Sequence, residues 1–148
     1  MISENADKDL EEILTQLDLK NGDTIYVSAD IAKCPLPMIK TSLTKEGIRA
    51  REQKWCEFVF NKLFSMIGEE GTLLVPTFSY SYARDQEPFS LETTPSETGP
   101  FTEFVRKKKE SIRSLHPIFS ITGIGKNAES ILRKVGKSAY GIASPFMR

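Results

Sequence analysis

The segment RSLHP, residues 113–117, holds the side chains with the most distinctive chemistry. It contains His116, the single histidine of the sequence, with Arg113 and Ser114 beside it. An imidazole can accept a proton near neutral pH, and a guanidinium next to a hydroxyl can bind phosphate or carboxylate oxygens. Structural roles are the alternatives: His116 would tie a strand to a loop, and Arg113 would pair with a carboxylate at a strand edge.

The two cysteines, Cys34 and Cys56, suggest no chemistry of their own. Two thiols are too few for a disulfide framework, and neither forms a C-x-x-C pair with His or Cys downstream, so we expect no metal site. A thiol nucleophile would need a nearby base, and only His116 could serve. We therefore expect two reduced, structural thiols.

The elements that must position these residues begin with a helix, a strand, a second helix and a second strand. Apolar residues at helical spacing predict a helix at 5–19, and the β-branched run 24–28 predicts a buried strand. Thr44 is the expected N-cap of a long helix reaching Ile67, and 72–76 (TLLVP) follows as a strand. Such a βαβ unit has parallel strands, with ligands bound beyond their carboxyl ends. The expected core face of the long helix comprises Trp55, Phe58, Val59, Leu63 and Met66.

Two irregular segments follow the predicted strands. Residues 29–40 contain two prolines and are expected to form a loop. Residues 77–97 show no regular period, and aromatic residues crowd their start, which favours an ordered loop around a site. Tyr80 and Tyr82 are candidates for lining an acceptor pocket, or for pinning this loop to the core.

The last third of the chain is expected to return to regular structure. Thr98 would cap a short helix with Pro100 in its first turn and Phe101, Phe104 and Val105 facing inward. Residues 111–125 predict one or two strands. A helix at 127–135, ended by Gly136, follows. The fold class expected is α/β, a mainly parallel sheet flanked by helices, in one domain over residues 1–148.

Composition limits the partners. Lysine plus arginine equals aspartate plus glutamate at 20 each in 148 residues, so no overall field attracts nucleic acid or anionic lipid. No apolar run approaches the roughly 18 residues of a membrane span, and the acidic N-terminus is unlike a signal peptide. We expect a cytoplasmic protein with a small-molecule partner, and no membrane or nucleic-acid partner.

Four segments, in order, resemble the aminoglycoside 3-N-acetyltransferase family, which includes relatives in polysaccharide biosynthesis as well as antibiotic resistance. They are GDTIYVSADI (22–31), GTLLVPTFS (71–79), TPSETGPFTEFVRKKKESIRSLHPIFSITGIG (94–125) and GIASP (141–145). The resemblance covers nearly the whole chain from about residue 8. It implies an α/β fold, acetyl-coenzyme A as cosubstrate and an amine acceptor, such as an aminoglycoside or an amino sugar.

The resemblance also suggests which residues contact the cofactor. The first-strand loop of the family usually reads His-Ser-Ser or His-Ser-Asp, where this chain has Ser-Ala-Asp, so backbone amides are the expected donors there. Hydroxyl and guanidinium groups further along would anchor the phosphates. The basic run RKKKE (106–110) either draws in these phosphates or is the solvated end of a helix. The expected cofactor-binding residues are Ser28, Ala29, Asp30, Ile31, Thr77, Ser111, Arg113 and Ser114.

The catalytic base is the open part of this assignment. In the family it is a histidine in a phrase beyond the Gly-x-x-Ser-Pro segment, and this sequence stops at Arg148. His116 is therefore only a weak catalytic candidate, expected to shape the site rather than to transfer the proton. The chain is expected to be incomplete relative to the family fold. It is either an N-acetyltransferase or its N-terminal portion, or else a non-catalytic coenzyme A-binding remnant or partner subunit, with self-association or a complementing C-terminal part as its assembly.

Overall fold

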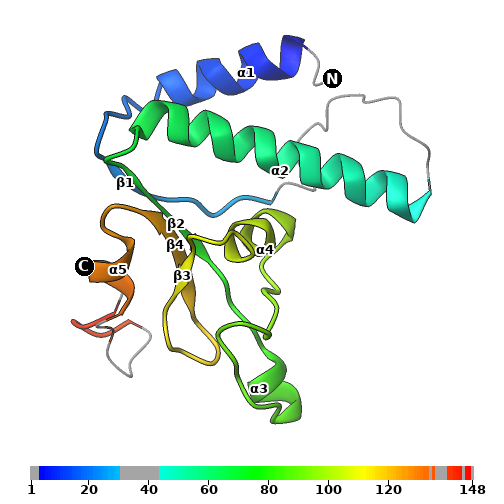
Figure 1. Cartoon of the computed structure of the whole chain (residues 1–148), viewed down its shortest axis with the longest axis vertical. Coiled ribbons are helices and arrows are strands. Elements are labelled where there is room, and N and C mark those ends of the chain that lie inside the picture. Colours follow the sequence, from blue (N-terminus) through cyan, green and yellow to red (C-terminus); the bar gives the residue numbers. More distant parts are fainter. Residues whose placement is uncertain (1–3, 31–43, 134, 136–139, 145, 148) are drawn as a thin grey trace.

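The computed structural model describes residues 4–30, 44–133, 135, 140–144 and 146–147. Their chain order is helix, strand, helix, strand, two short helices, two strands and a last short helix (Figure 1). The elements are α1 Glu4–Thr15, β1 Thr24–Tyr26, α2 Lys45–Ile67, β2 Thr72–Pro76, α3 Ser81–Asp85, α4 Pro100–Arg106, β3 Ile112–Arg113, β4 Ile121–Gly125 and α5 Ala128–Leu132.

The long helix and second strand were predicted correctly because their ends carry local signals. The Thr44 side chain accepts a hydrogen bond from the Gly47 amide at 3.2 Å, as an N-cap does. Gly68 ends the helix with a φ of 67°, a left-handed conformation that favours glycine. The strand that follows is buried at every position, as a central strand is.

The sheet is mixed, so the expectation of a mainly parallel sheet was wrong. Its order is β1-β2-β4-β3, and only β1 and β2 are parallel, whereas β4 is antiparallel to both of its neighbours. The chain leaves β2, returns through α4 and enters β3 in the same direction as β2. A hairpin then inserts β4 into the gap between them. The carboxyl ends of β1, β2 and β3 consequently point to the same end of the sheet, where the hairpin loop 114–120 connects β3 to β4.

Several predicted ends shift by a few residues. The first helix ends at Thr15, and the last spans only Ala128–Leu132; Gly136 lies outside the described residues. Gly99 is the N-cap of α4, not Thr98. The Thr98 hydroxyl donates instead to the Pro76 carbonyl, joining this segment to the end of β2. Most of the predicted loop 29–40 also lies outside the described residues.

The core has one part on each face of the sheet. Leu73 and Val75 of β2 pack with α2 and α4, while Leu74 between them faces α5. This alternation follows the two-residue period of a strand, and Figure 1 shows α4 and α5 on opposite sides of the sheet. Of the predicted core face of α2, Trp55 and Leu63 are buried, and Phe58, Val59 and Met66 pack partly buried against them.

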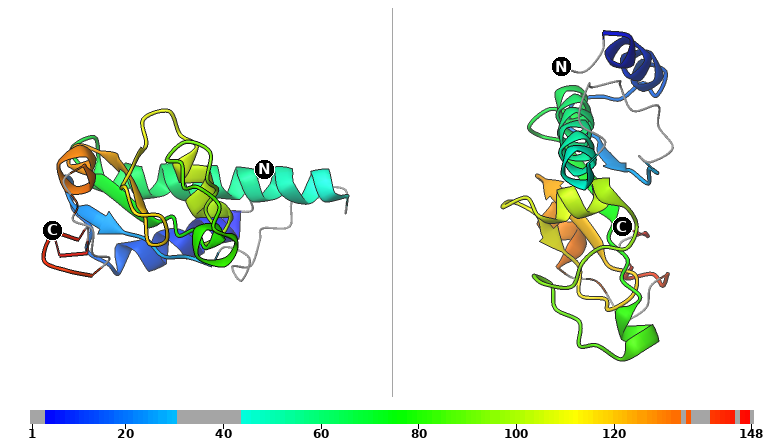
Figure 2. Two further views of the ribbon diagram at one scale, coloured as in Figure 1. Left: turned by 90° about the horizontal axis from the view of Figure 1, so that it is seen from below. Right: turned by 90° about the vertical axis from the view of Figure 1, so that its right-hand side faces the viewer.

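Two elements extend away from the sheet. The N-terminal part of α2 extends past the rest of the ribbon, and α3 lies at the end opposite α1 (Figures 1 and 2). Within the described part of the chain no helix is both long enough and apolar enough to span a bilayer.

Candidate functional site

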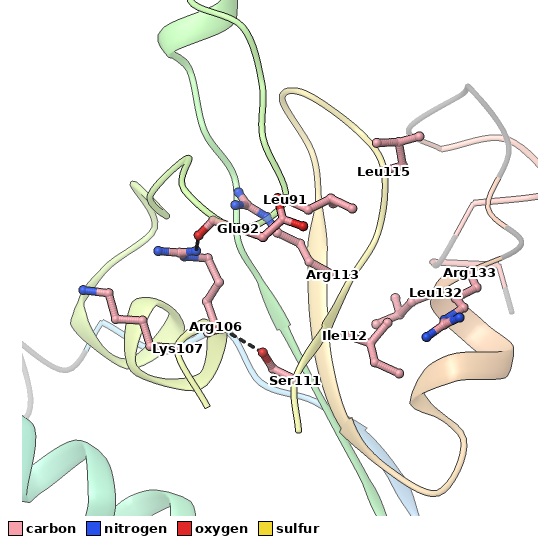
Figure 3. Close-up of a pocket in the computed structure, with 10 residues that line it drawn as sticks. All are labelled: Leu91, Glu92, Arg106, Lys107, Ser111, Ile112, Arg113, Leu115, Leu132 and Arg133. Atoms are coloured by element: carbon pink, nitrogen blue, oxygen red, sulfur yellow. Dashed lines mark hydrogen bonds between the residues drawn. The ribbon is translucent and has the colours of Figure 1, made fainter. Parts of the chain in front are cut away.

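A cavity of about 740 Å³ lies beside β3, the edge strand of the sheet (Figure 3). Its size falls within the range of small-molecule and cofactor sites. Figure 3 shows Arg106 and Lys107 on one side and Leu132 and Arg133 across from them. The lining residues are Leu91, Glu92, Arg106, Lys107, Ser111, Ile112, Arg113, Leu115, Leu132 and Arg133.

The cavity lining carries four cationic side chains and one carboxylate. Arg106 forms two hydrogen bonds with the Glu103 carboxylate, each of 2.7 Å, and its Nη1 donates to the Glu92 carbonyl at 2.7 Å. Burial alone would raise the pKa of Glu103, but hydrogen bonds from Arg106, the Ser96 amide and Lys107 lower it to about 2. The Glu103–Arg106 pair is therefore a fixed part of the wall.

The Arg113 guanidinium is directed into the protein. Its Nε donates to the Ser120 hydroxyl at 3.0 Å, Nη2 to the Thr77 carbonyl at 2.8 Å, and Nη1 to the Thr94 carbonyl. The guanidinium carbon lies 4.9 Å from the centre of the Phe89 ring. Burial, together with nearby Arg106, lowers the pKa of Arg113 to about 10, at which it remains charged at neutral pH.

Lys107 and Arg133 are the two cations of the cavity that face water. Lys107 lies 3.2 Å from Glu103, and Arg133 lies 3.1 Å from Glu129. Both cationic side chains are about two-thirds exposed, at 67% and 66%. Because ion pairs exposed on both sides contribute little free energy, Arg133 can exchange Glu129 for an anionic ligand at small cost. Glu103, the partner of Lys107, is 21% exposed and is also bonded to Arg106, so Lys107 is free to turn toward a ligand without leaving that carboxylate unpaired.

The predicted hydroxyl ligands mostly bond within the protein. Thr77 and Ser114 are buried; the Thr77 hydroxyl lies 3.0 Å from that of Thr122, and the Ser114 hydroxyl accepts from the Ile121 amide at 2.9 Å. Ser111 lines the cavity and donates to the Arg106 carbonyl at 2.7 Å. The structure thus brings Thr77, Arg113 and Ser111 into one region, with Ser111 at the cavity.

The predicted contacts after β1 lie at the opposite edge of the sheet. Ser28 and Asp30 are exposed, and Ala29 packs partly buried against the core; Ile31 lies outside the described residues. Two strands separate β1 from β3. At about 4.8 Å per strand, β1 and β3 are about 14 Å apart, whereas Thr77 directly follows β2, the strand paired with β1.

His116 holds the hairpin between β3 and β4. Its Nδ1 accepts hydrogen bonds from the Ile118 and Phe119 amides at 3.2 and 2.8 Å. Since Nδ1 must then be unprotonated, the proton of the neutral ring is on Nε2, which is a donor and has no free lone pair. Burial also lowers the pKa of His116. The geometry matches the structural alternative of an imidazole that ties a strand to a loop.

The predicted acceptor-binding tyrosines lie near the start of the 77–97 loop, at the beginning of the short helix α3. Tyr80 and Tyr82 are 40% and 49% exposed, so neither ring is packed into the core. The loop is ordered and includes the short helix α3. Glu97 holds the end of the loop to its start, because its carboxylate accepts a hydrogen bond from the Tyr80 amide at 2.7 Å. This hydrogen bond also lowers the pKa of Glu97.

Cys56 is a buried thiol, as expected. Burial and the neighbouring Glu52 raise its pKa to about 11, so it stays protonated and unreactive at neutral pH. Cys34 lies outside the described residues. Among the residues that the structure describes, no three His, Cys, Asp or Glu side chains are grouped to hold a metal ion.

Sequence reasoning missed most of the cavity wall. Leu91, Leu115 and Leu132 come from three separate segments, and no local pattern links them. Glu103 and Arg106 at i, i+3 were the available signal, because this spacing places both side chains on one side of α4.

Comparison with known proteins places this fold in a family. The family model described as aminoglycoside 3-N-acetyltransferase matches residues 38–148. The comparison with curated protein sequences yields no match.

Three solved structures illustrate the structural likeness. YokD from Bacillus subtilis is 21% identical with a TM-score of 0.70, and the match covers 95% of this chain and 59% of that one. AAC-IIIb, solved as a binary complex with CoASH, is 21% identical with a TM-score of 0.68 over 95% and 53%. AAC(3)-IVa in complex with a gentamicin, solved as a variant, is 22% identical with a TM-score of 0.68 over 95% and 48%.

The chain therefore spans about half to three-fifths of the length of these proteins, and matches them over nearly all of its own. The family resemblance predicted from the four sequence segments is confirmed by a family model covering three-quarters of the sequence. The chain belongs to the aminoglycoside 3-N-acetyltransferase family.

Proposed function

We propose that the chain supplies the cofactor-binding part of a coenzyme A-dependent N-acetyltransferase that acts on an aminoglycoside or amino-sugar acceptor. The family match over residues 38–148 is the observation that carries the proposal. The likeness to AAC-IIIb, solved with CoASH, and to AAC(3)-IVa, solved with a gentamicin, supports the two ligand classes.

In this reaction the acceptor nitrogen attacks the thioester carbonyl of acetyl-coenzyme A. The N–C bond forms and the C–S bond breaks, so coenzyme A leaves as a thiolate and the nitrogen gives up a proton. The site must therefore provide a base, donors for the developing oxyanion and an anchor for the phosphates of the cofactor. The described residues support the third of these requirements best.

The proposed phosphate contacts are Lys107 and Arg133 at the cavity. Ser111 lines the same cavity, and its hydroxyl would have to leave the Arg106 carbonyl to reach a phosphate. Both cations face water. The Arg133–Glu129 pair is exposed on both sides, so a phosphate can replace Glu129, and Lys107 can turn from Glu103, which stays bonded to Arg106. The backbone around Ser28 and Asp30 remains the proposed contact at the other edge of the sheet, for a more distant part of this extended cofactor. Thr77, Arg113 and Ser114 are proposed to shape the site around these contacts, since their polar groups bond within the protein.

A second candidate function, a coenzyme A-binding unit or partner subunit without its own base, is favoured by the geometry of His116. This is the only histidine in the sequence, and its Nδ1 already accepts two backbone hydrogen bonds. A base supplied from outside this chain would then complete the reaction.

Calorimetric titration with coenzyme A tests the proposal. We expect binding weaker than about 1 μM, or roughly −8 kcal/mol, because the cavity is open and its cations are partly neutralised. Lys107→Ala with Arg133→Ala should abolish the titration, and Lys126→Ala, which removes a surface cation paired with Glu70, is the matched control. The absence of binding at millimolar coenzyme A would overturn the proposed function.

A thiol-release assay with gentamicin as the acceptor separates the two candidates. The second candidate predicts no acetyl transfer above background by the chain alone. If the chain turns over, His116→Ala is the decisive variant. Loss of activity in a folded mutant that still binds the cofactor would make His116 the base, contrary to the geometry described above.

A further inference from the structure

Arg113 joins three separate parts of the loop 77–97 to β3 at the edge of the sheet. Its hydrogen bonds reach the Thr77 carbonyl at the start of the loop and the Thr94 carbonyl near its end, while its guanidinium lies against the Phe89 ring between them. The remaining bond, to the Ser120 hydroxyl, attaches the same group to the start of β4. One side chain therefore fixes both arms of the loop.

These contacts depend on the shape of a guanidinium. All three acceptors are uncharged oxygens that lie in different directions, which a planar fork of N–H donors can satisfy together. A lysine ammonium has a single nitrogen and cannot reach three separated acceptors while its stem stays in the same place. Arg113→Lys therefore keeps the positive charge but cannot form the three hydrogen bonds together.

The neighbouring pair on α4 holds the second arm of the loop as well. Arg106 donates to the Glu92 carbonyl at 2.7 Å, and Glu103 accepts from the Ser96 amide at 2.9 Å. The arm from 92 to 96 is thus bound at three points, with Arg113 at the middle one. Tyr80 and Tyr82 follow three and five residues after Thr77 on the first arm, and their side chains are 40% and 49% exposed.

We propose that Arg113 is a positioning residue that fixes the loop 77–97, so that Tyr80 and Tyr82 are already in place to form one wall of the binding site for the amine acceptor. The acceptor part of this inference rests on the proposed function, whereas the fixing of the loop does not. It gives Arg113 a role different from a phosphate anchor, because its donors are bonded to the loop it positions.

Hydrogen exchange tests the fixing of the loop without any ligand. In Arg113→Lys the amides of Thr94 and Glu97, which bond to the Ser90 and Phe78 carbonyls, should exchange roughly ten-fold faster, with α2 and β2 unchanged. Arg133→Lys is the matched control, since Arg133 lines the same cavity but lies outside the loop and forms an exposed pair with Glu129. Unchanged exchange in Arg113→Lys overturns the proposal. If Arg113→Lys does not fold, Phe89→Leu decides, because loss of the stacking surface should loosen the same amides.

Binding of two ligands then separates positioning from anchoring. In Arg113→Lys the affinity for gentamicin should fall roughly ten-fold while that for coenzyme A stays within about two-fold. A loss of coenzyme A affinity with unchanged loop exchange would make Arg113 a phosphate anchor and overturn the inference. If the wild-type chain binds neither ligand, the proposed function and the acceptor role fail together, and hydrogen exchange still decides whether Arg113 fixes the loop.

Discussion

Two charged residues of the site differ in what they bind, although both are arginines on neighbouring elements. Arg106 shares its charge with Glu103, whereas Arg113 bonds to carbonyls and a hydroxyl. Burial and the proximity of Arg106 together lower the pKa of Arg113 to about 10. The carboxylate of Glu103 therefore offsets the charge of two partly buried guanidinium groups, and removing it should destabilise the charged form of both.

Glu103→Gln should destabilise the protein by about 3 kcal/mol at neutral pH, because it leaves Arg106 without its carboxylate. The pKa of Glu103 is lowered in the folded state, so its contribution is complete above the ordinary value of 4.5 and is lost as the pH falls toward about 2. Denaturant unfolding between pH 7 and pH 2 measures both effects. The wild-type and mutant stabilities should converge at the acid end.

Glu129→Gln is the matched control for this experiment. Glu129 pairs with Arg133, another arginine of the cavity wall, at i, i+4 spacing on a helix. Both side chains of this pair are more than 60% exposed. Little change is expected, at any pH in the range. An equal loss in both variants would show that the burial of Glu103 does not matter.

At the scale of elements, sequence signals worked where the determining residues are close together. Thr44 and Gly68 define α2 at its two ends, and a continuous apolar run defines β2. The direction of β4 could not be read in this way. The direction of β4 depends on the crossover through α4 and on the hairpin that inserts β4 between β2 and β3. Both are features of the tertiary structure, with no local sequence signal.

The candidate site shows the same limit more strongly. The RSLHP segment stands out by its residue types, but the carbonyls that Arg113 bonds to are 19 and 36 residues away. Backbone acceptors carry no residue-type signal, so a sequence pattern cannot reveal them. The hydrogen bonds of His116 are easier to anticipate, because its partners are amides two and three residues further along the chain.

Two glycines at element ends offer a test of how the backbone positions the sheet. Gly99 before α4 and Gly125 at the end of β4 have similar φ values of 120° and 117°, which residues other than glycine rarely adopt. A Cβ on Gly99 would meet nothing within 4 Å, whereas a Cβ on Gly125 would collide with the Gly71 carbonyl oxygen.

Both alanine variants should therefore be strained, and Gly125→Ala should be the worse. We expect a loss of about 1–3 kcal/mol for Gly99→Ala, from backbone strain alone. Gly125→Ala adds a collision with backbone that cannot move without disturbing the β2–β4 pairing, so its loss should be at least about 2 kcal/mol greater. Thermal or denaturant unfolding measures the difference, and equal losses would contradict the packing described for Gly125.

At the scale of the whole molecule, a set of aromatic rings links segments far apart in the sequence. Tyr26 contacts Phe146 at 5.6 Å between ring centres, Phe146 contacts Tyr140 at 5.2 Å, and Tyr140 contacts Phe119 of the hairpin at 5.6 Å. Several apolar side chains around these rings face water. Tyr140 is 63% exposed, Ile142 91% and Met147 66%.

Because a connected apolar surface of this kind favours association, we expect the chain to self-associate in a concentration-dependent manner. On a sizing column, the apparent mass should rise above that of the monomer as the loading concentration increases. Ile142→Ser should shift the protein toward the monomer, since it removes the most exposed large apolar side chain described. Leu17→Ser is the matched control: Leu17 is 59% exposed but belongs to the turn after α1 rather than to the segments that carry these rings, so the substitution should leave the elution unchanged. A wild-type chain that elutes as a monomer at every concentration, or an equal response to both substitutions, would show that this surface does not drive association.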